Sequence, residues 1–342
     1  MLRYNLIQPQ QIVQEEVPVP QPGPGEVLVA VKNVGICGSD IHAYYGQHPY
    51  ISCPVVPGHE FAGVVTRVGD GVDEAWLGKR VTALPSLVCG KCYNCRNGRF
   101  NICQGLKVIG CQSDGALAEF VKAPADKLFP LPDEMSWETA TLVEPLAVAV
   151  HAVRIAGDIV GQRVVIYGGG TIGLLVMQVA KAYGAKEVIL SEPDAFRRNL
   201  AKELGANHVI DPGAIQPSRW LEDKFGPEGI DLSFECVGIE ATVHQAILSS
   251  RKGTTIVIVG VFSKPIMVDM GLVQDRELRL LGTLMYTKTD FTEALELLEQ
   301  GRVQGSPLIT HRLDFADAHQ AFDLIEQQKG SCIKLMIKAA KS

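Results

Sequence analysis

The sequence predicts an α/β protein that combines a mostly β domain with a doubly wound parallel sheet. Short apolar runs alternate with helical segments between residues 161 and 281, as in parallel strands joined by crossover helices. A G-x-G-x-x-G spacing follows the first of these runs. The first part of the chain is instead rich in proline and glycine and alternates apolar with polar residues, which is typical of antiparallel strands.

The composition is that of an ordinary globular enzyme. The 342 residues suffice for two domains, and 46% are hydrophobic and 20% charged. A net charge of −6 without a basic block argues against nucleic acid and anionic membrane as partners. No apolar stretch approaches the roughly 20 residues of a membrane span, and the N-terminus lacks the apolar segment of a signal peptide. We expect a cytoplasmic protein that acts on a small molecule.

Polar residues follow the first strand of the predicted β domain. Cys37 comes after the end of that strand and is expected to project from a turn, with the hydroxyl of Ser39 and the imidazole of His42 nearby. Strands of this domain are predicted at residues 26–34, 60–68, 80–83 and 118–121.

His59 and Glu60 are adjacent at the start of a predicted strand. Neighbouring residues of a regular strand point to opposite faces. Both side chains can therefore approach one metal only if the chain bends there, which Pro57 and Gly58 make plausible. Otherwise one of the two contacts the metal ligands without binding the metal itself.

Four of the nine cysteines lie close together in the sequence. Cys89, Cys92, Cys95 and Cys103 have the spacing C-x2-C-x2-C-x7-C. Four thiolates close a tetrahedral site with no open position, as in structural zinc sites. An iron–sulfur cluster is the alternative, but its familiar motif has a shorter last gap followed by proline. We predict a structural zinc lobe at residues 89–103.

A helical stretch is predicted at residues 137–155, with Pro145 inside it. Proline lacks a backbone donor and should end or kink the helix at that point. Glu144 stands beside it among Leu142, Val143 and Leu146. A carboxylate in apolar surroundings needs a partner, either a metal or a cation. The alternative is a carboxylate that faces solvent on an amphipathic helix.

The glycine-rich motif predicts a dinucleotide site. The strand at 164–167 leads into Gly168, Gly170 and Gly173, which suit a tight turn, close approach of the pyrophosphate and close helix packing. The alternative is a glycine-rich turn without a ligand. The helix 174–183 should be buried. The predicted cofactor-binding residues are Gly168, Gly170, Thr171, Ile172, Gly173, Glu192, Arg197, Val259, Val261, Thr283 and Leu284, and the further strands are 188–190, 208–210, 230–235, 254–259 and 278–281.

Glu192 favours NAD over NADP. It lies 19 residues after Gly173, where a carboxylate accepts from the ribose hydroxyls and repels a 2′-phosphate. Arg197 and Arg198 weaken this preference, because arginine can bind such a phosphate.

The last part of the chain does not extend the parallel sheet. Helices are predicted at 290–300 and 315–327, and a strand at 333–337. We expect these elements to return to the first domain. The predicted domains are therefore 1–152 with 292–342, and 153–291.

Taken in order, these motifs resemble the zinc-dependent medium-chain dehydrogenases along the whole chain. The resemblance implies a GroES-like catalytic domain, a Rossmann NAD-binding domain, and one catalytic and one structural zinc per chain. The catalytic zinc would be held by Cys37, His59 and a third ligand. Liver-type alcohol dehydrogenases have a cysteine where Glu144 stands, so the match is closer to the polyol (sorbitol-type) branch. In that branch Glu60 can also enter and leave the metal shell.

The resemblance also implies a reaction. Zinc would lower the pKa of a bound secondary alcohol of a polyol, sugar acid or similar polar substrate, and the resulting alkoxide would give hydride to NAD. Ser39 and His42 resemble the family's proton relay; the alternative for His42 is a surface imidazole. Formal charge favours Glu144 over Glu60 as the resting third ligand. A homodimer or homotetramer is expected.

Two other functions stay open. One is oxidation of an amino alcohol, as in the threonine dehydrogenases, although that branch usually has aspartate at Glu144 and threonine at Ser39. The other is a non-catalytic binding or redox-sensing protein. The intact residues Cys37, His59 and Glu144 argue against it, because a retired site does not need an open metal position.

Overall fold

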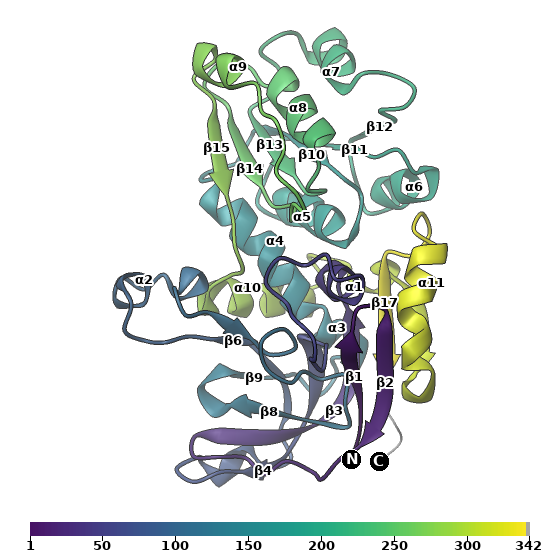
Figure 1. Cartoon of the computed structure of the whole chain (residues 1–342). Helices are drawn as coiled ribbons and strands as arrows, with labels where there is room; N and C mark the ends of the chain where they lie inside the picture. The colour runs from purple at the N-terminus through teal and green to yellow at the C-terminus, as the bar shows by residue number, and fades with distance from the viewer. Residues whose placement is uncertain (340–342) are drawn as a thin grey trace. The chain divides into compact units, whose positions relative to one another are not determined.

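The computed structural model describes residues 1–339 and divides into two compact units (Figure 1). The first consists of Met1–Glu144, Thr287–Glu299 and the part of the chain from Leu308 onward. The second consists of Pro145–Tyr286 and Gln300–Pro307. The domain ranges inferred from the sequence stay a prediction.

The first unit is built on a seven-stranded sheet. Its strand order is β16-β17-β3-β4-β5-β9, with β8 also paired to β3. All of these pairs are antiparallel except β16 with β17. The strands are β3 (Glu26–Ile36), β4 (Glu60–Val68), β5 (Arg80–Ala83), β8 (Phe120–Pro124), β9 (Leu128–Pro130), β16 (Ile309–Asp314) and β17 (Lys334–Lys338), and a separate hairpin is formed by β1 (Leu2–Gln8) and β2 (Gln11–Glu16).

A short helix follows β3 where the sequence suggested a turn. Helix α1 (Gly38–Tyr44) begins directly after Cys37, which is its N-cap residue. The Asp40 carboxylate accepts the backbone N–H of Cys37 at 2.9 Å. An acidic side chain at this position satisfies a donor at the start of a helix. This local interaction explains why the segment is helical.

The predicted helix at 137–155 is divided, but not at Pro145. It forms α3 (Trp137–Thr141) and α4 (Val143–Ile155), and the break lies at Leu142. The expectation of a break or kink at Pro145 is therefore wrong. Pro145 lies in the first turn of α4, where the missing N–H has no intrahelical partner to lose.

A small lobe of the first unit carries the cysteine cluster. It contains β6 (Ser86–Leu87) and β7 (Lys107–Val108), which pair antiparallel, together with α2 (Tyr93–Arg96) and the 3₁₀ turn η2 (Phe100–Ile102). The lobe has few buried apolar side chains apart from two of its cysteines, Cys95 and Cys103.

The second unit is a doubly wound α/β fold. Its six strands are all parallel, in the order β12-β11-β10-β13-β14-β15. This is the order 3-2-1-4-5-6 of dinucleotide-binding sheets. The strands are β10 (Arg163–Tyr167), β11 (Glu187–Ser191), β12 (His208–Ile210), β13 (Leu232–Glu235), β14 (Thr255–Ile258) and β15 (Arg279–Gly282), and the helices are α5 (Thr171–Ala182), α6 (Ala195–Glu203), α7 (Pro217–Phe225), α8 (Glu240–Ser249) and α9 (Met270–Asp275).

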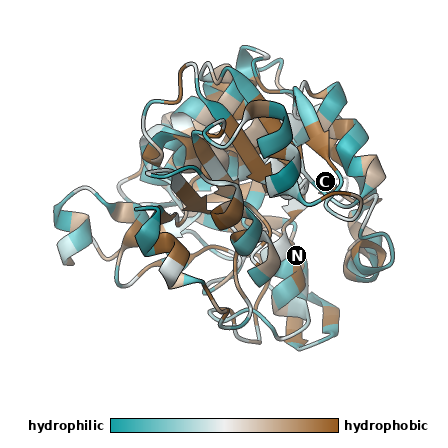
Figure 2. Cartoon of the chain, turned by 90° about the horizontal axis from the view of Figure 1, so that it is seen from above, coloured by the Kyte–Doolittle hydropathy of each residue, from teal (hydrophilic) through white to brown (hydrophobic). Residues whose placement is uncertain are grey.

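The central strands of this sheet form the core of the second unit. Val165, Ile189 and Ile256 have no exposed surface, as expected for strands that are covered on both faces. Figure 2 shows the apolar residues in brown on such strands, with hydrophilic residues in teal along the surrounding helices. Helix α5 is also buried, as the sequence predicted, and Gly184 ends it with a positive φ of 87°.

The C-terminal part of the chain adds β16 and β17 to the sheet of the first unit. It also contains α10 (Lys288–Glu299), the 3₁₀ segment η5 (Phe315–Gln320) and α11 (Ala321–Gln327). Strand β16 was not predicted, and β17 pairs with β3 so that Leu335 lies opposite Ile36. Within residues 1–339, no helix is both long and apolar enough to cross a membrane.

Candidate metal and dinucleotide sites

Cys37, His59 and Glu60 come together in the first unit. One possible ligand atom of each lies within 4.8 Å of the others. Ligands of a tetrahedral zinc are roughly 3.5 Å apart, given zinc–ligand bonds of about 2.0–2.3 Å. The bend predicted before Glu60 is present: Gly58 has a φ of 99°, and β4 begins only at Glu60. The two neighbouring side chains can therefore face one site.

Asp40 lies beside the imidazole of His59, a contact that the sequence analysis missed. Asp40 is 1% exposed, and its Oδ1 lies 3.6 Å from His59 Nδ1. On the other side of the ring, Nε2 is 3.5 Å from the hydroxyl oxygen of Ser39. Carboxylates commonly orient metal-binding histidines through the nitrogen that does not bind the metal. Nε2 is therefore the nitrogen available to a metal.

The electrostatics of this cluster suit a cation. Burial lowers the pKa of His59, but the Asp40 carboxylate and the hydrogen bonds of the ring to the sulfurs of Cys111 and Cys37 outweigh it, so the pKa lies well above the usual 6.5. Burial also raises the pKa of Asp40, against the opposing effect of His59. The donor set therefore fits zinc, which binds thiolate, imidazole and carboxylate.

Glu60 also contacts a buried lysine that the sequence analysis did not identify. Lys334 Nζ lies 2.7 Å from each Glu60 carboxylate oxygen. Glu60 is 0% exposed and Lys334 is 2% exposed. No local motif marks Lys334, because the contact joins residues 274 positions apart.

Glu144 is buried but does not belong to the close group of ligand atoms. It is 4% exposed, and its charge contributes to raising the pKa of Lys334. Among the described residues, the close group consists of Cys37, His59 and Glu60. Glu144 therefore does not face solvent, which was the alternative raised from the sequence. Which carboxylate is the third ligand stays a proposal.

Ser39 and His42 lie on α1, three residues apart and so on one face of the helix. Burial lowers the pKa of His42 below 6.5. His48 lies close enough for the charge of His42 to lower its pKa too, although burial is the larger cause. His48 was not singled out from the sequence.

Cys111 is a further neighbour that had no assigned role. Its thiol is hydrogen-bonded to His59. A Cβ atom at Gly110 would collide with the backbone of Gly58 and His59, so these two segments are in close contact. The only sequence signal was its position after the zinc lobe.

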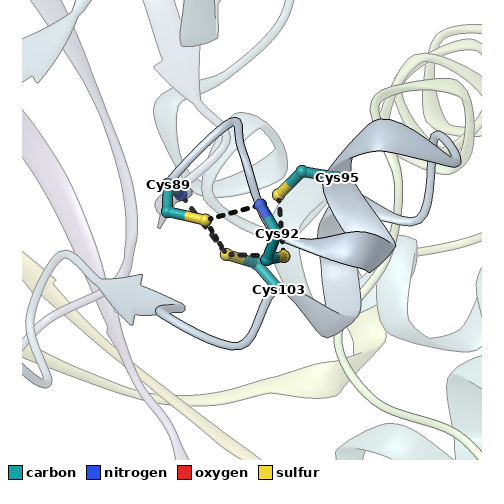
Figure 3. Close-up of side chains that lie close together, drawn as sticks. All are labelled: Cys89, Cys92, Cys95 and Cys103. Carbon is teal, nitrogen blue, oxygen red and sulfur yellow. Dashed lines mark hydrogen bonds between the residues drawn. The ribbon is translucent and has the colours of Figure 1, made fainter.

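The four cysteines of the lobe converge on one point (Figure 3). Sγ–Sγ distances are 3.5 Å between Cys92 and Cys95, 3.9 Å between Cys92 and Cys103, and 3.4 Å between Cys89 and Cys103. Sulfur atoms around a tetrahedral zinc are roughly 3.8 Å apart. The predicted cluster therefore has the dimensions of a closed four-thiolate site.

Backbone N–H groups point at sulfur atoms of this cluster. The N–H groups of Cys95 and Gln104 lower the pKa of Cys92 to about 6. The N–H groups of Cys89 and Gly105 each lie 3.3 Å from Cys103 Sγ. Thiolate rather than thiol is the metal-binding form.

In the second unit, the glycine motif forms the turn between β10 and α5. Gly168 has a φ of 106°, which other residues rarely adopt. Gly173 packs so closely on the carbonyl of Gly168 that no Cβ would fit. Gly170 is the N-cap residue of α5, and the first turn of a helix offers N–H groups to phosphates. The turn therefore suits a pyrophosphate.

Glu192 lies beside this turn. Its Oε2 accepts the N–H of Gly169 at 2.7 Å, and its Oε1 that of Asp194 at 2.9 Å. Arg197 Nη1 lies 3.9 Å from the position that a Cβ of Gly170 would take. Arg198 is tied to Asp211 at 2.9 Å and to the carbonyls of Glu192 and Pro193.

The other predicted cofactor residues follow β14 and β15 at the carboxyl end of the parallel sheet. Val261 and Leu284 are 50% and 53% exposed there, and Thr283 donates its N–H to Ile258. Ligands of such sheets bind at the carboxyl ends of the strands. Two apolar residues after β13, which the sequence analysis missed, share this exposure: Val237 at 42% and Ile239 at 48%.

Two family profiles match the chain. Residues 23–133 match the alcohol dehydrogenase GroES-like domain, and residues 171–300 match the zinc-binding dehydrogenase domain. The predicted fold class, of a GroES-like domain with a Rossmann domain, is confirmed.

Among curated proteins, the L-threonine 3-dehydrogenase of Pyrococcus furiosus is 37% identical over 94% of each chain. The sorbitol dehydrogenase of Bacillus subtilis is 32% identical over 96% of this chain and 94% of its own. Among solved structures, an alcohol dehydrogenase of Escherichia coli CFT073 in complex with NADH is 32% identical, with a TM-score of 0.93 over 99% of both chains. The chain therefore belongs to the zinc-dependent medium-chain dehydrogenases, which are NAD(P)-linked oxidoreductases acting on CH–OH groups.

Proposed function

We propose that this dehydrogenase oxidises a secondary alcohol of a polyol, sugar acid or similar polar molecule to the ketone. The observation that supports this most is the convergence of Cys37, His59 and Glu60 within 4.8 Å, with the Ser39 hydroxyl 3.5 Å from His59 Nε2. A metal there would have a proton acceptor beside it. Glu144 is the proposed third ligand.

When bound, zinc supplies a Lewis acid that brings the pKa of a bound hydroxyl towards neutrality, and the nicotinamide accepts a hydride. The chain supplies the proton path and the orientation. Ser39 Oγ takes the hydroxyl proton and passes it to His42. The Asp40 carboxylate lies 3.6 Å from Nδ1 of His59, which favours Nε2 as the nitrogen that would face the metal.

NAD is the proposed cofactor. Glu192 stands where a carboxylate would repel a 2′-phosphate. Arg198, which could have bound that phosphate, is already held by Asp211 and by two backbone carbonyls. Arg197 is the proposed contact to the adenosine side of the cofactor.

L-threonine or a related amino alcohol is the second candidate substrate. It is favoured by the 37% identity with the threonine dehydrogenase of Pyrococcus furiosus. Glu144 and Ser39, where that branch usually has aspartate and threonine, favour the polyol group instead.

The test is a dehydrogenase screen of zinc-loaded protein with polyols, aldonates and 3-hydroxy amino acids, each with NAD and with NADP. We expect reduction of the cofactor with a polyol or sugar acid, and a kcat/KM at least about tenfold higher with NAD, equal to about 1.4 kcal/mol. Zinc content should be about two per chain, and Cys37→Ser should lower it to about one.

Three results would contradict this. Selective turnover of L-threonine would move the enzyme to the amino-alcohol group. Preference for NADP would overturn the role of Glu192. Full activity of Cys37→Ser would remove the proposed metal site.

A reducing compartment fits the thiols. All nine cysteines are free, including the four that converge in the lobe, and metal-binding thiolates need to stay reduced. We therefore propose the cytoplasm as the location. For assembly we propose a homodimer or homotetramer, supported by the exposed apolar residue Leu280 on β15, the edge strand of the parallel sheet.

A further inference from the structure

Lys334 is a buried cation that connects the two chain segments of the proposed metal site. Its Nζ lies 2.7 Å from both oxygens of Glu60 and 3.2 Å from the carbonyl oxygen of Ile36. An ammonium group has three N–H donors, so each has an acceptor. Ile36 precedes Cys37 and Glu60 follows His59, so one side chain ties together the backbones beside both ligands.

The sheet leaves room for the Glu60 carboxylate in this position only because residue 35 is glycine. Gly35 lies opposite Glu60 in the β3–β4 pair. A Cβ atom at residue 35 would overlap Glu60 Oε2. The carboxylate is therefore folded over β3, against Lys334 on the neighbouring β17.

The surroundings make the ion pair with Lys334 strong. Both oxygens of the Glu60 carboxylate lie 2.7 Å from Lys334 Nζ, and neither residue is more than 2% exposed. This is the geometry of an ammonium ion paired with a carboxylate. Lys334 offers Glu60 a permanent positive partner next to the place where a metal would offer another.

The formal charge of the metal site would change if the Glu60 carboxylate became a ligand. Zinc held by the Cys37 thiolate, neutral His59 and the Glu144 carboxylate would be formally neutral. A further bound carboxylate would fill the open position and weaken the Lewis acid that the reaction needs.

We propose that Lys334 is a positioning residue that holds Glu60 by both oxygens and so keeps it from becoming a ligand that closes the metal site. This rests on the proposed function of Cys37 and His59 as metal ligands. Lys334 acts through Glu60 and does not itself touch the substrate.

The test compares the release of zinc to a chelator in four forms of the full-length protein: wild type, Lys334→Met, Glu60→Gln and the double variant. The four-cysteine zinc gives a second phase that serves as an internal reference. Lys334→Met removes the charge and keeps the length of the side chain. Lys334→Arg is the control that keeps the charge.

We expect Lys334→Met to release the Cys37–His59 zinc on the order of 10- to 100-fold more slowly. Metal affinity typically changes by this range when residues that contact the metal ligands are mutated. Cobalt in this site should show an altered absorption spectrum, because the number of ligands rises. The double variant should lose both effects, because the freed carboxylate is gone. Glu60→Gln alone should leave zinc release within about twofold of wild type.

Two results would overturn the proposal. If Glu60→Gln releases zinc much faster, Glu60 is already a ligand; this arm decides the question even if Lys334→Met does not fold. If folded Lys334→Met releases zinc at the wild-type rate or faster, Lys334 has only a structural role. Failure of the proposed function would look different: wild-type protein would bind only the four-cysteine zinc, with no second phase in any form.

Discussion

Asp40 shows how one side chain can organise several residues at once. One carboxylate oxygen accepts the N–H of Cys37, and the other lies 3.6 Å from His59 Nδ1. It thus starts helix α1 and orients the imidazole. Because α1 also carries Ser39 and His42, this one residue places a proposed ligand and the proposed proton path relative to each other.

The same helix leads to a prediction about pH. Burial lowers the pKa of His42 below 6.5, so its ring stays neutral, and able to accept a proton, in mildly acidic solution. His42→Asn should lower kcat roughly 10²-fold at low pH, the smaller end of the effect of a positioned proton acceptor. The loss should shrink at high pH, where hydroxide replaces the ring. A kcat–pH profile measures this.

His244→Asn, on the exposed side of α8, is the matched control.

The lowered pKa of His42 also determines how the stability of the fold depends on pH. Because the folded pKa is below the unfolded value, the unfolded chain binds the proton more readily. The contribution of neutral His42 to stability is present above about pH 6.5 and is lost as the pH falls towards the folded pKa. An equal loss of activity in His42→Asn at every pH would remove His42 from the proton path.

At the scale of elements, short local signals were the reliable ones. The glycine turn before α5 and the clustered cysteines were predictable because their spacing within a few residues determines their geometry. The start of α1 was missed although its signal is also local: Asp40, three residues after Cys37, was not considered as a residue that starts a helix. The break at Leu142 was misplaced because Pro145 can end a helix or lie in its first turn, and the sequence alone does not distinguish these.

The zinc lobe gives the prediction for this scale. With few buried apolar residues, the lobe should depend on its metal. Cys92→Ser should lose the zinc of the four-cysteine site. The free energy of unfolding should fall by roughly 4 kcal/mol or more, as is usual when a metal site is lost. Metal analysis and thermal unfolding measure the two effects.

Cys53→Ser is the control, because Cys53 lies outside both groups of close metal-ligand candidates among the described residues. It should keep about two zinc ions per chain. If Cys92→Ser keeps both ions and the same melting temperature, the four cysteines do not form a structural zinc site.

For the whole molecule, the order of elements could be predicted, but the long-range pairs could not. The alternation of strands and helices was enough to infer the parallel sheet. Nothing near residue 334 indicates that its side chain meets Glu60, and nothing in Cys111 indicates a contact with His59. Such contacts arise only when distant segments pack, so they require the structure.

The assembly can be tested at the same scale. A chain of 37.0 kDa should give a mass two or four times as large by light scattering. Leu280→Lys, at the exposed β15 edge, should shift the mass towards the monomer, because a charge on an edge strand opposes pairing. Val160→Lys, at an exposed apolar residue outside any strand, should leave the mass unchanged. A monomeric wild-type protein would contradict the expectation.

The late position of β17 in the chain has a consequence for biosynthesis. A ribosome must translate 274 residues beyond Glu60 before the ammonium group that balances it exists. Until then, Glu60 lacks its counter-ion, and a buried unpaired charge is strongly unfavourable. Chains that terminate before β17 should therefore stay open to quality-control proteases.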